Sequence, residues 1–129
     1  MKEINFRKTV NGSVEETVQK VTEVLKTEGF GVLTRIDLHS KIKEKLGHEI
    51  APAVVLGACN PQLAYEAYLR NTDVASLIPC NAVVREIEPG KISVELMKPS
   101  AMMEILGDKE LVTLAQDADT RLRRALEKI

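Results

Sequence analysis

The sequence predicts an α+β fold: a five-stranded, mostly antiparallel sheet with two long helices on one face and short helices in the loops. Five short segments have the apolar patterns of strands, and two longer segments repeat apolar residues at helical spacing. These segments follow one another in the order strand, helix, four strands, helix, which is typical of α+β domains. The length of 129 residues and the apolar content of 44% predict a single domain over residues 1–129.

The first two strands are predicted on either side of a long helix. Apolar and polar residues alternate over residues 4–10, and the turn signal Asn11-Gly12 follows. Ser13 and Glu16 have the spacing of a capping box and open the helix. Its apolar stripe consists of Val14, Val18, Val21 and Leu25. The second strand is predicted at residues 30–36, and because a helical crossover connects the two strands, they should run parallel.

Two short helices are predicted on either side of a third strand. Asp37 is the expected N-cap of the first helix, at residues 38–47, whose apolar stripe is Leu38, Ile42 and Leu46. Residues 52–59 form the third strand, which is apolar on both faces. Asn60-Pro61 has the pattern of an N-cap followed by a first helical residue, and it begins a helix over residues 61–70. This helix is expected to bury Leu63, Ala64, Ala67 and Tyr68.

A hairpin and a long helix are predicted at the end of the chain. Strands at residues 80–87 and 91–97 are joined by the turn Pro89-Gly90, and Ile92, Val94 and Leu96 should point inward. A helical turn follows at residues 100–106, and Asp108 caps the final helix. The stripe of that helix consists of Leu111, Leu114 or Ala115, Ala118, Leu122, Ala125 and Ile129.

The only two cysteines, Cys59 and Cys80, are predicted to be neighbours although they are 21 positions apart. If strands two to five form an antiparallel meander, the end of the third strand and the start of the fourth lie at the same edge of the sheet. Lys98, at the end of the fifth strand, falls at that edge as well. The recurring Cys-Asn pair therefore predicts one site assembled from two loops.

Three interpretations of this site are open. The dipole of the helix that begins at Pro61 would lower the pKa of Cys59, so that Cys59 and Cys80 are candidate catalytic residues for redox or transfer chemistry. The site could instead hold a small anionic ligand, a carboxylate or phosphate. The candidate ligand-binding residues are then Asn60, Gln62, Asn81 and Lys98. Alternatively, both cysteines are small buried hydrophobic residues.

Composition argues against several other function classes. With a net charge of −1, 3% aromatic residues and no Trp, we expect no nucleic-acid and no membrane partner. No apolar run resembles a signal peptide or a membrane span, which predicts a cytoplasmic protein with reduced thiols. His39 and His48 lack metal-ligand spacing relative to the cysteines, so no metal site is expected.

One face of the predicted sheet lacks a layer of long helices. Ala53 and Val55, with Leu33 and Val83 on the neighbouring strands, would form an apolar surface on that face. A bare apolar face is unusual in a soluble monomer. Either the short helices at residues 38–46 and 61–70 cover it, or a second subunit does; a homodimer is therefore expected.

Three segments, EGFGVLTRID, LGACNPQLAYEAY and IPCNAVV, together resemble the family known as domain of unknown function 302. The resemblance covers essentially the whole chain, and the paired ACNP and PCN segments make it specific. It implies a fold like that of the TATA-binding protein and a homodimer. It brings no established activity, no defined catalytic residue and no identifiable cofactor.

Together these observations predict a dimeric small-ligand binding or sensing module with its site at the edge that carries Cys59 and Cys80. A thiol-dependent redox or transfer enzyme is the first alternative, with Cys59 as nucleophile and Cys80 as resolving partner. An accessory interaction protein is the second. The absence of a CxxC motif and of a general base nearby in sequence favours the binding module.

Overall fold

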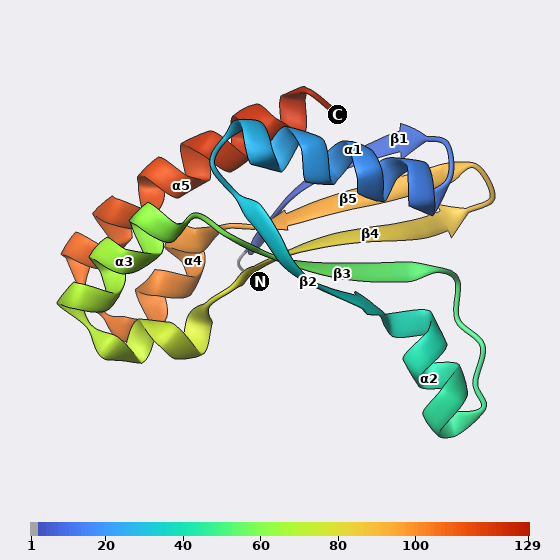
Figure 1. Cartoon of the computed structure of the whole chain (residues 1–129), viewed down its shortest axis with the longest axis horizontal. Helices are drawn as coiled ribbons and strands as arrows, with labels where there is room; N and C mark the ends of the chain where they lie inside the picture. The colour runs from blue at the N-terminus through green and yellow to red at the C-terminus, as the bar shows by residue number, and fades with distance from the viewer. Residues whose placement is uncertain (1–2) are drawn as a thin grey trace.

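The computed structural model describes residues 3–129. Its five strands form one sheet in the order β1-β5-β4-β3-β2, and every neighbouring pair is antiparallel. The elements are β1 (Asn5–Asn11), α1 (Val14–Thr27), β2 (Gly31–Asp37), α2 (Leu38–Leu46), β3 (Ala53–Cys59), α3 (Pro61–Arg70), the 3-10 helix η1 (Thr72–Leu77), β4 (Cys80–Glu88), β5 (Lys91–Met97), α4 (Pro99–Met103), the 3-10 helix η2 (Glu104–Leu106) and α5 (Lys109–Glu127) (Figure 1). The predicted α+β fold and its element order are confirmed. Four antiparallel pairings leave β1 and β2 running in the same direction, as the crossover predicts, although they lie at opposite edges.

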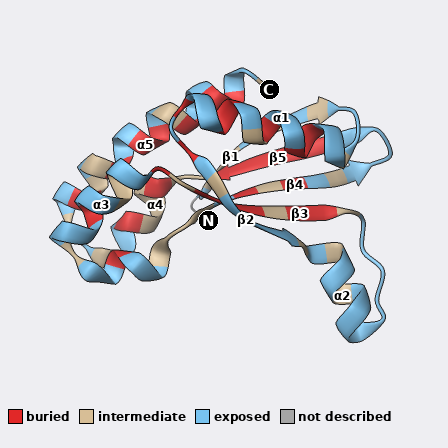
Figure 2. Cartoon of the chain, in the orientation of Figure 1, coloured by how far each residue is buried: buried red, intermediate tan, exposed pale blue. Residues whose placement is uncertain are grey.

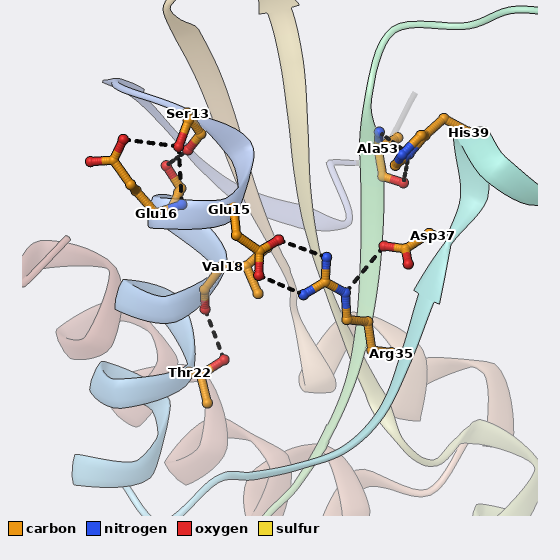
Figure 3. A network of polar contacts seen from close by, with 10 residues as sticks. Ser13, Glu15, Glu16, Val18, Thr22, Arg35, Asp37, His39 and Ala53 are labelled. Carbon is orange, nitrogen blue, oxygen red and sulfur yellow. Dashed lines mark hydrogen bonds and ion pairs between the residues drawn. The ribbon is translucent and has the colours of Figure 1, made fainter.

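Most helix starts have the expected caps. Ser13 Oγ accepts a hydrogen bond from the Glu16 N–H (3.1 Å) and donates one to Glu16 Oε1 (3.0 Å). Asp108 Oδ1 accepts from the N–H groups of the first turn of α5. The side chain of Asp37, by contrast, makes no cap hydrogen bond for α2. It accepts instead from Arg35 Nε (3.1 Å), because the guanidinium next to it on the same strand is a stronger partner than a backbone N–H (Figure 3).

The main core lies between the sheet and the two long helices, which cover the same face (Figures 1 and 2). Its largest fully buried side chains include Phe30, Leu25 and Leu56. A second hydrophobic cluster lies beyond the end of the sheet, among α3, η1, α4 and α5, and consists of Ala67, Val74, Met103, Leu111 and Ala115. The site described below lies where the two clusters meet.

The alternation along β2 differs from the prediction because of a β-bulge. The register shifts between Val32 and Thr34, so Val32 pairs with Ala58 on the helix-covered face whereas Ile36 pairs with Val55 on the open face. Simple alternation had placed Val32 and Ile36 together. A bulge inserts one extra residue and reverses the alternation beyond it.

Neither short helix covers the open face of the sheet. α3 packs with η1 and α5 beyond the sheet end, and of its predicted buried residues Ala67 is buried, Leu63 and Ala64 are half-buried, and Tyr68 is 47% exposed. The prediction for Tyr68 is wrong because only a narrow stripe of this helix meets its neighbours. α2 has no buried residue and stands off the sheet edge, away from α1 and α5 (Figures 1 and 2).

Candidate functional site

The two cysteines are brought together by the register of β3 and β4. Ala58 pairs with Cys80 and Gly57 pairs with Asn81, so Cys59 lies one residue from the partner of Cys80. Both cysteines are unpaired and half-buried, and both line the same pocket. The predicted neighbourhood of Cys59 and Cys80 is thus present in the fold.

The two cysteine segments also interlock sterically. Gly57 has no Cβ, and a Cβ built there would lie 2.3 Å from Thr34 Oγ1 and 2.9 Å from Pro79 Cγ. Pro79, directly before Cys80, therefore packs against a position directly before Ala58-Cys59 that only glycine can occupy without displacing its neighbours. This contact explains why the first cysteine segment has a glycine at position 57, opposite Pro79 of the second segment.

The pocket has a volume of about 60 Å³ and lies between the end of the sheet, α3, η1, α4 and α5. Its walls are almost entirely apolar: Phe30 and Ala58 come from the sheet side, Leu63 from α3, and Met103 from α4. The thiols of Cys59 and Cys80 and the side chain of Asn60 are the remaining polar or polarizable groups. Such a lining suits a neutral ligand far better than a charged one.

The thiol pKa values move opposite to the expected direction. Burial raises the pKa of Cys59. Burial also raises the pKa of Cys80 to about 12, and nearby Cys59 and Asp119 act in the same direction. The expected depression by the α3 dipole is wrong because the thiols face the apolar pocket, where desolvation disfavours the thiolate. At neutral pH both groups are thiols.

Four residues were candidates for binding an anion, and the structure gives them different surroundings. Asn60 is buried and uses Oδ1 to accept from the Leu63 N–H (3.1 Å), so it caps α3 as predicted. Gln62 is exposed and donates to a side chain of its own helix. Asn81 is also exposed. Lys98 Nζ lies 5.1 Å from the centre of the Phe6 ring. Of the four, only Asn60 lines the pocket.

Asp119 was not singled out from the sequence, yet it organises one wall of the pocket. This buried residue of α5 accepts from the Ser100 N–H (Oδ1, 3.0 Å) and from the Ser100 hydroxyl. It thereby holds the first turn of α4, whose residues Pro99 and Met103 line the pocket. The available signal was one acidic residue next to the apolar stripe of the last helix.

The histidines lie far from the cysteines. His39 Nδ1 accepts from the Ala53 N–H (3.0 Å) at the opposite end of β3, which fixes the first turn of α2 to the sheet edge (Figure 3). His48 is exposed. Among residues 3–129, no three His, Cys, Asp or Glu side chains are grouped as metal ligands. In the same part of the chain, no helix has the length and apolar character needed to cross a membrane.

Comparison with known proteins agrees with the fold and the motifs. The structure is similar to the crystal structure of an uncharacterized conserved protein DUF302 from Bacillus stearothermophilus, with a TM-score of 0.90 and 32% sequence identity over 98% of both chains. No curated protein matches the chain. The family described as "Domain of unknown function DUF302" matches residues 6–129. The chain therefore belongs to the DUF302 family.

Proposed function

We propose that this protein is a binding module for a small, neutral, largely apolar ligand that occupies the pocket beside Cys59 and Cys80. One observation carries the proposal: a pocket with almost entirely apolar walls opens next to two protonated thiols where the two hydrophobic clusters meet. A mostly apolar cavity with a few polar groups is the usual form of a small-molecule site.

The size of the pocket limits the ligand. A buried water needs a cavity of roughly 10–15 Å³. A pocket of about 60 Å³ therefore accommodates about four to six water-sized positions, which corresponds to a short apolar group of a few heavy atoms. We infer that the ligand inserts one such group and that the polarizable thiols contact it.

Charge argues against the anionic ligand that the sequence also suggested. Among residues 3–129, no lysine or arginine lines the pocket, and the carboxylate of Asp119 lies close enough to raise the pKa of Cys80. An anion in this place would lose its hydration without gaining a counter-charge. The Leu63 N–H at the start of α3 is already bound by Asn60 Oδ1.

A thiol-dependent enzyme is the second function suggested by the sequence, and the geometry gives it less support. The thiolate is the nucleophile in disulfide exchange and in covalent catalysis. Burial keeps both cysteines protonated at neutral pH. Binding without covalent chemistry fits these thiols better.

The test compares two probes that share one carbon chain, n-butanol and the butyrate anion. Resonances of the Met103 and Ala64 methyl groups are followed by NMR while each probe is added. We expect saturable shifts with n-butanol and none with butyrate. Saturable binding of butyrate alone would instead support an anion site, and no saturable shift with either probe would count against a ligand pocket.

A pair of α3 variants controls for non-specific binding. Ala64 lines the pocket and is half-buried, so Ala64→Leu should fill the space and abolish the n-butanol shifts. Glu66 is exposed on the same helix and does not line the pocket, so Glu66→Leu should leave them unchanged. Equal responses of the two variants would show that n-butanol binds elsewhere.

A further inference from the structure

Helix α2 has an apolar stripe that no other element in the described part of the chain, residues 3–129, covers. Leu38 is 39% exposed and Leu46 is 67% exposed, and Ile50, just after the helix, is 41% exposed. No residue of α2 is buried. A nine-residue helix is marginal in water by itself, and helices in proteins gain most of their stability from packing an apolar face. The apolar stripe of α2 therefore needs another apolar surface to pack against.

The open face of the sheet is the second uncovered surface. On β2, β3 and β4 this face is apolar, with Ile36 paired to Val55 and Val55 paired to Val83. Ile36 is 47% exposed, and the two valines are half-buried. Neither α2 nor α3 of the same chain covers these residues. The sequence had left open whether these helices or a second subunit would do so.

A polar cluster occupies the rest of that face. Glu95 on β5 is buried, and its Oε2 accepts from Arg7 Nη1 (2.6 Å), Arg85 Nε (2.9 Å) and the Ser93 hydroxyl (3.0 Å). Arg7 and Arg85 themselves remain close to half exposed. The open face thus has an apolar area next to a group of charged side chains that bond to one another. Protein–protein interfaces usually have this arrangement, with an apolar core and a polar rim.

We propose that a second copy of this chain covers the open face, and that each copy lays its α2 across β2, β3 and β4 of the other. The dimensions match. A helix of nine residues is about 14 Å long, and three neighbouring strands span about 14 Å across the sheet. α2 also projects beyond the sheet edge (Figure 1), so it can reach another molecule without leaving its place in the fold.

The available area and the symmetry both favour a second copy over an unrelated partner. Five strands of about seven residues present a face of about 23 by 24 Å, and α2 adds a footprint of about 14 by 10 Å. The sum, about 700 Å² in projection, approaches the roughly 800 Å² per partner of a standard interface. A twofold axis would bury both uncovered surfaces in both copies at once, because each chain carries one helix stripe and one matching sheet face.

The test begins with the mass of the native protein in solution, measured by analytical ultracentrifugation over a range of concentrations. We expect a reversible dimer. Leu46→Glu on α2 and Ile36→Glu on the open face should each raise the dimer dissociation constant at least about tenfold. Leu69→Glu on α3 is the matched control, because Leu69 is as exposed as Leu46, 67% in each case, and lies outside the proposed interface.

A crosslinking experiment identifies which surfaces meet. A photoreactive amino acid replaces Leu46, and isotopically labelled and unlabelled chains are mixed, so that crosslinks between copies are distinguishable by mass. We expect crosslinks from α2 of one copy to peptides of β3 and β4 of the other. A monomer at all concentrations, a dimer that Leu46→Glu leaves intact, or crosslinks confined to one chain would each overturn the proposal.

Discussion

Alkylation of the two cysteines in the reduced native protein tests the electrostatics of the site most directly. Burial raises the pKa of Cys80 to about 12, whereas an ordinary thiol has a pKa of about 8.5. At pH 7.5 the thiolate fraction of a free thiol is about 0.1, and that of Cys80 would be about 3 × 10⁻⁵, roughly 3,000-fold lower. A more basic thiolate is intrinsically more reactive, by about 40-fold for this difference at a Brønsted coefficient near 0.45. Cys80 should therefore react about 75-fold more slowly than a cysteine in an unfolded peptide.

The rate of Cys80 should also rise about tenfold per pH unit past pH 8.5, where the rate of a free thiol levels off. The assay is a time course with iodoacetamide at several pH values, with Cys59 and Cys80 quantified separately by mass spectrometry. Cys59 should react faster than Cys80 but more slowly than the unfolded reference, because burial raises its pKa as well. A repeat in low urea shows whether the observed reaction requires unfolding. Reaction of either native thiol at or above the unfolded rate below pH 8 would refute our account of the site.

Three further predictions concern stability. Because the folded pKa of Cys80 is raised to about 12, the folded state binds this proton more tightly than the unfolded state above pH 8.5. Through this group the unfolding free energy should fall with rising pH by up to about 1.4 kcal/mol per pH unit, and Cys80→Ala should reduce the slope measured in urea titrations. Asp119→Ala removes the side chain that caps α4, so it should lower the unfolding free energy by about 1–2 kcal/mol and weaken n-butanol binding. Asp117 is exposed on the same helix, and Asp117→Ala should change the unfolding free energy by less than about 0.5 kcal/mol. Equal losses of stability in the two variants would contradict the role of Asp119. The hydrogen bond from Lys128 lowers the pKa of Glu28, so this pair stabilises the protein above pH 4.3 and less as the pH falls below it; Glu28→Gln should reduce stability at pH 7 and flatten the acid side of the pH–stability curve.

Element order and the helix starts were predictable because they depend on short stretches of chain. Ser13, Asn60 and Asp108 each cap a helix whose apolar stripe begins within one turn. Each cap requires only a side-chain oxygen and a backbone N–H nearby in the chain, so the residue type and its position are enough to predict it. The neighbourhood of Cys59 and Cys80 was also predictable, because an antiparallel meander alone places them at one sheet edge.

Features that depend on spatial neighbours were not predictable. The bulge in β2 follows from how β2 and β3 fit together, and nothing in the apolar pattern around Leu33 indicates it. Asp37 fails as a cap because Arg35 is a better partner. Asp119 was not singled out, since its partner Ser100 is 19 positions away in sequence.

The pKa of the two thiols depends on a balance between positive charge, which lowers it, and burial, which raises it. The prediction from sequence gave too much weight to the positive charge. A helix dipole at the N-terminus of α3 and the charge of Lys98 would each stabilise a thiolate, and the sequence shows both. Yet Asn60 Oδ1 takes up an N–H group of that terminus, and Lys98 packs over Phe6.

What remains around the thiols is apolar wall and one buried carboxylate, and both favour the neutral form. The close approach of Pro79 to Gly57 brings the two cysteine segments together beside that wall. The same residues that suggested a reactive pair thus line an apolar pocket, which we propose holds an uncharged ligand. The pH dependence of alkylation tests whether the pair is reactive without knowledge of that ligand.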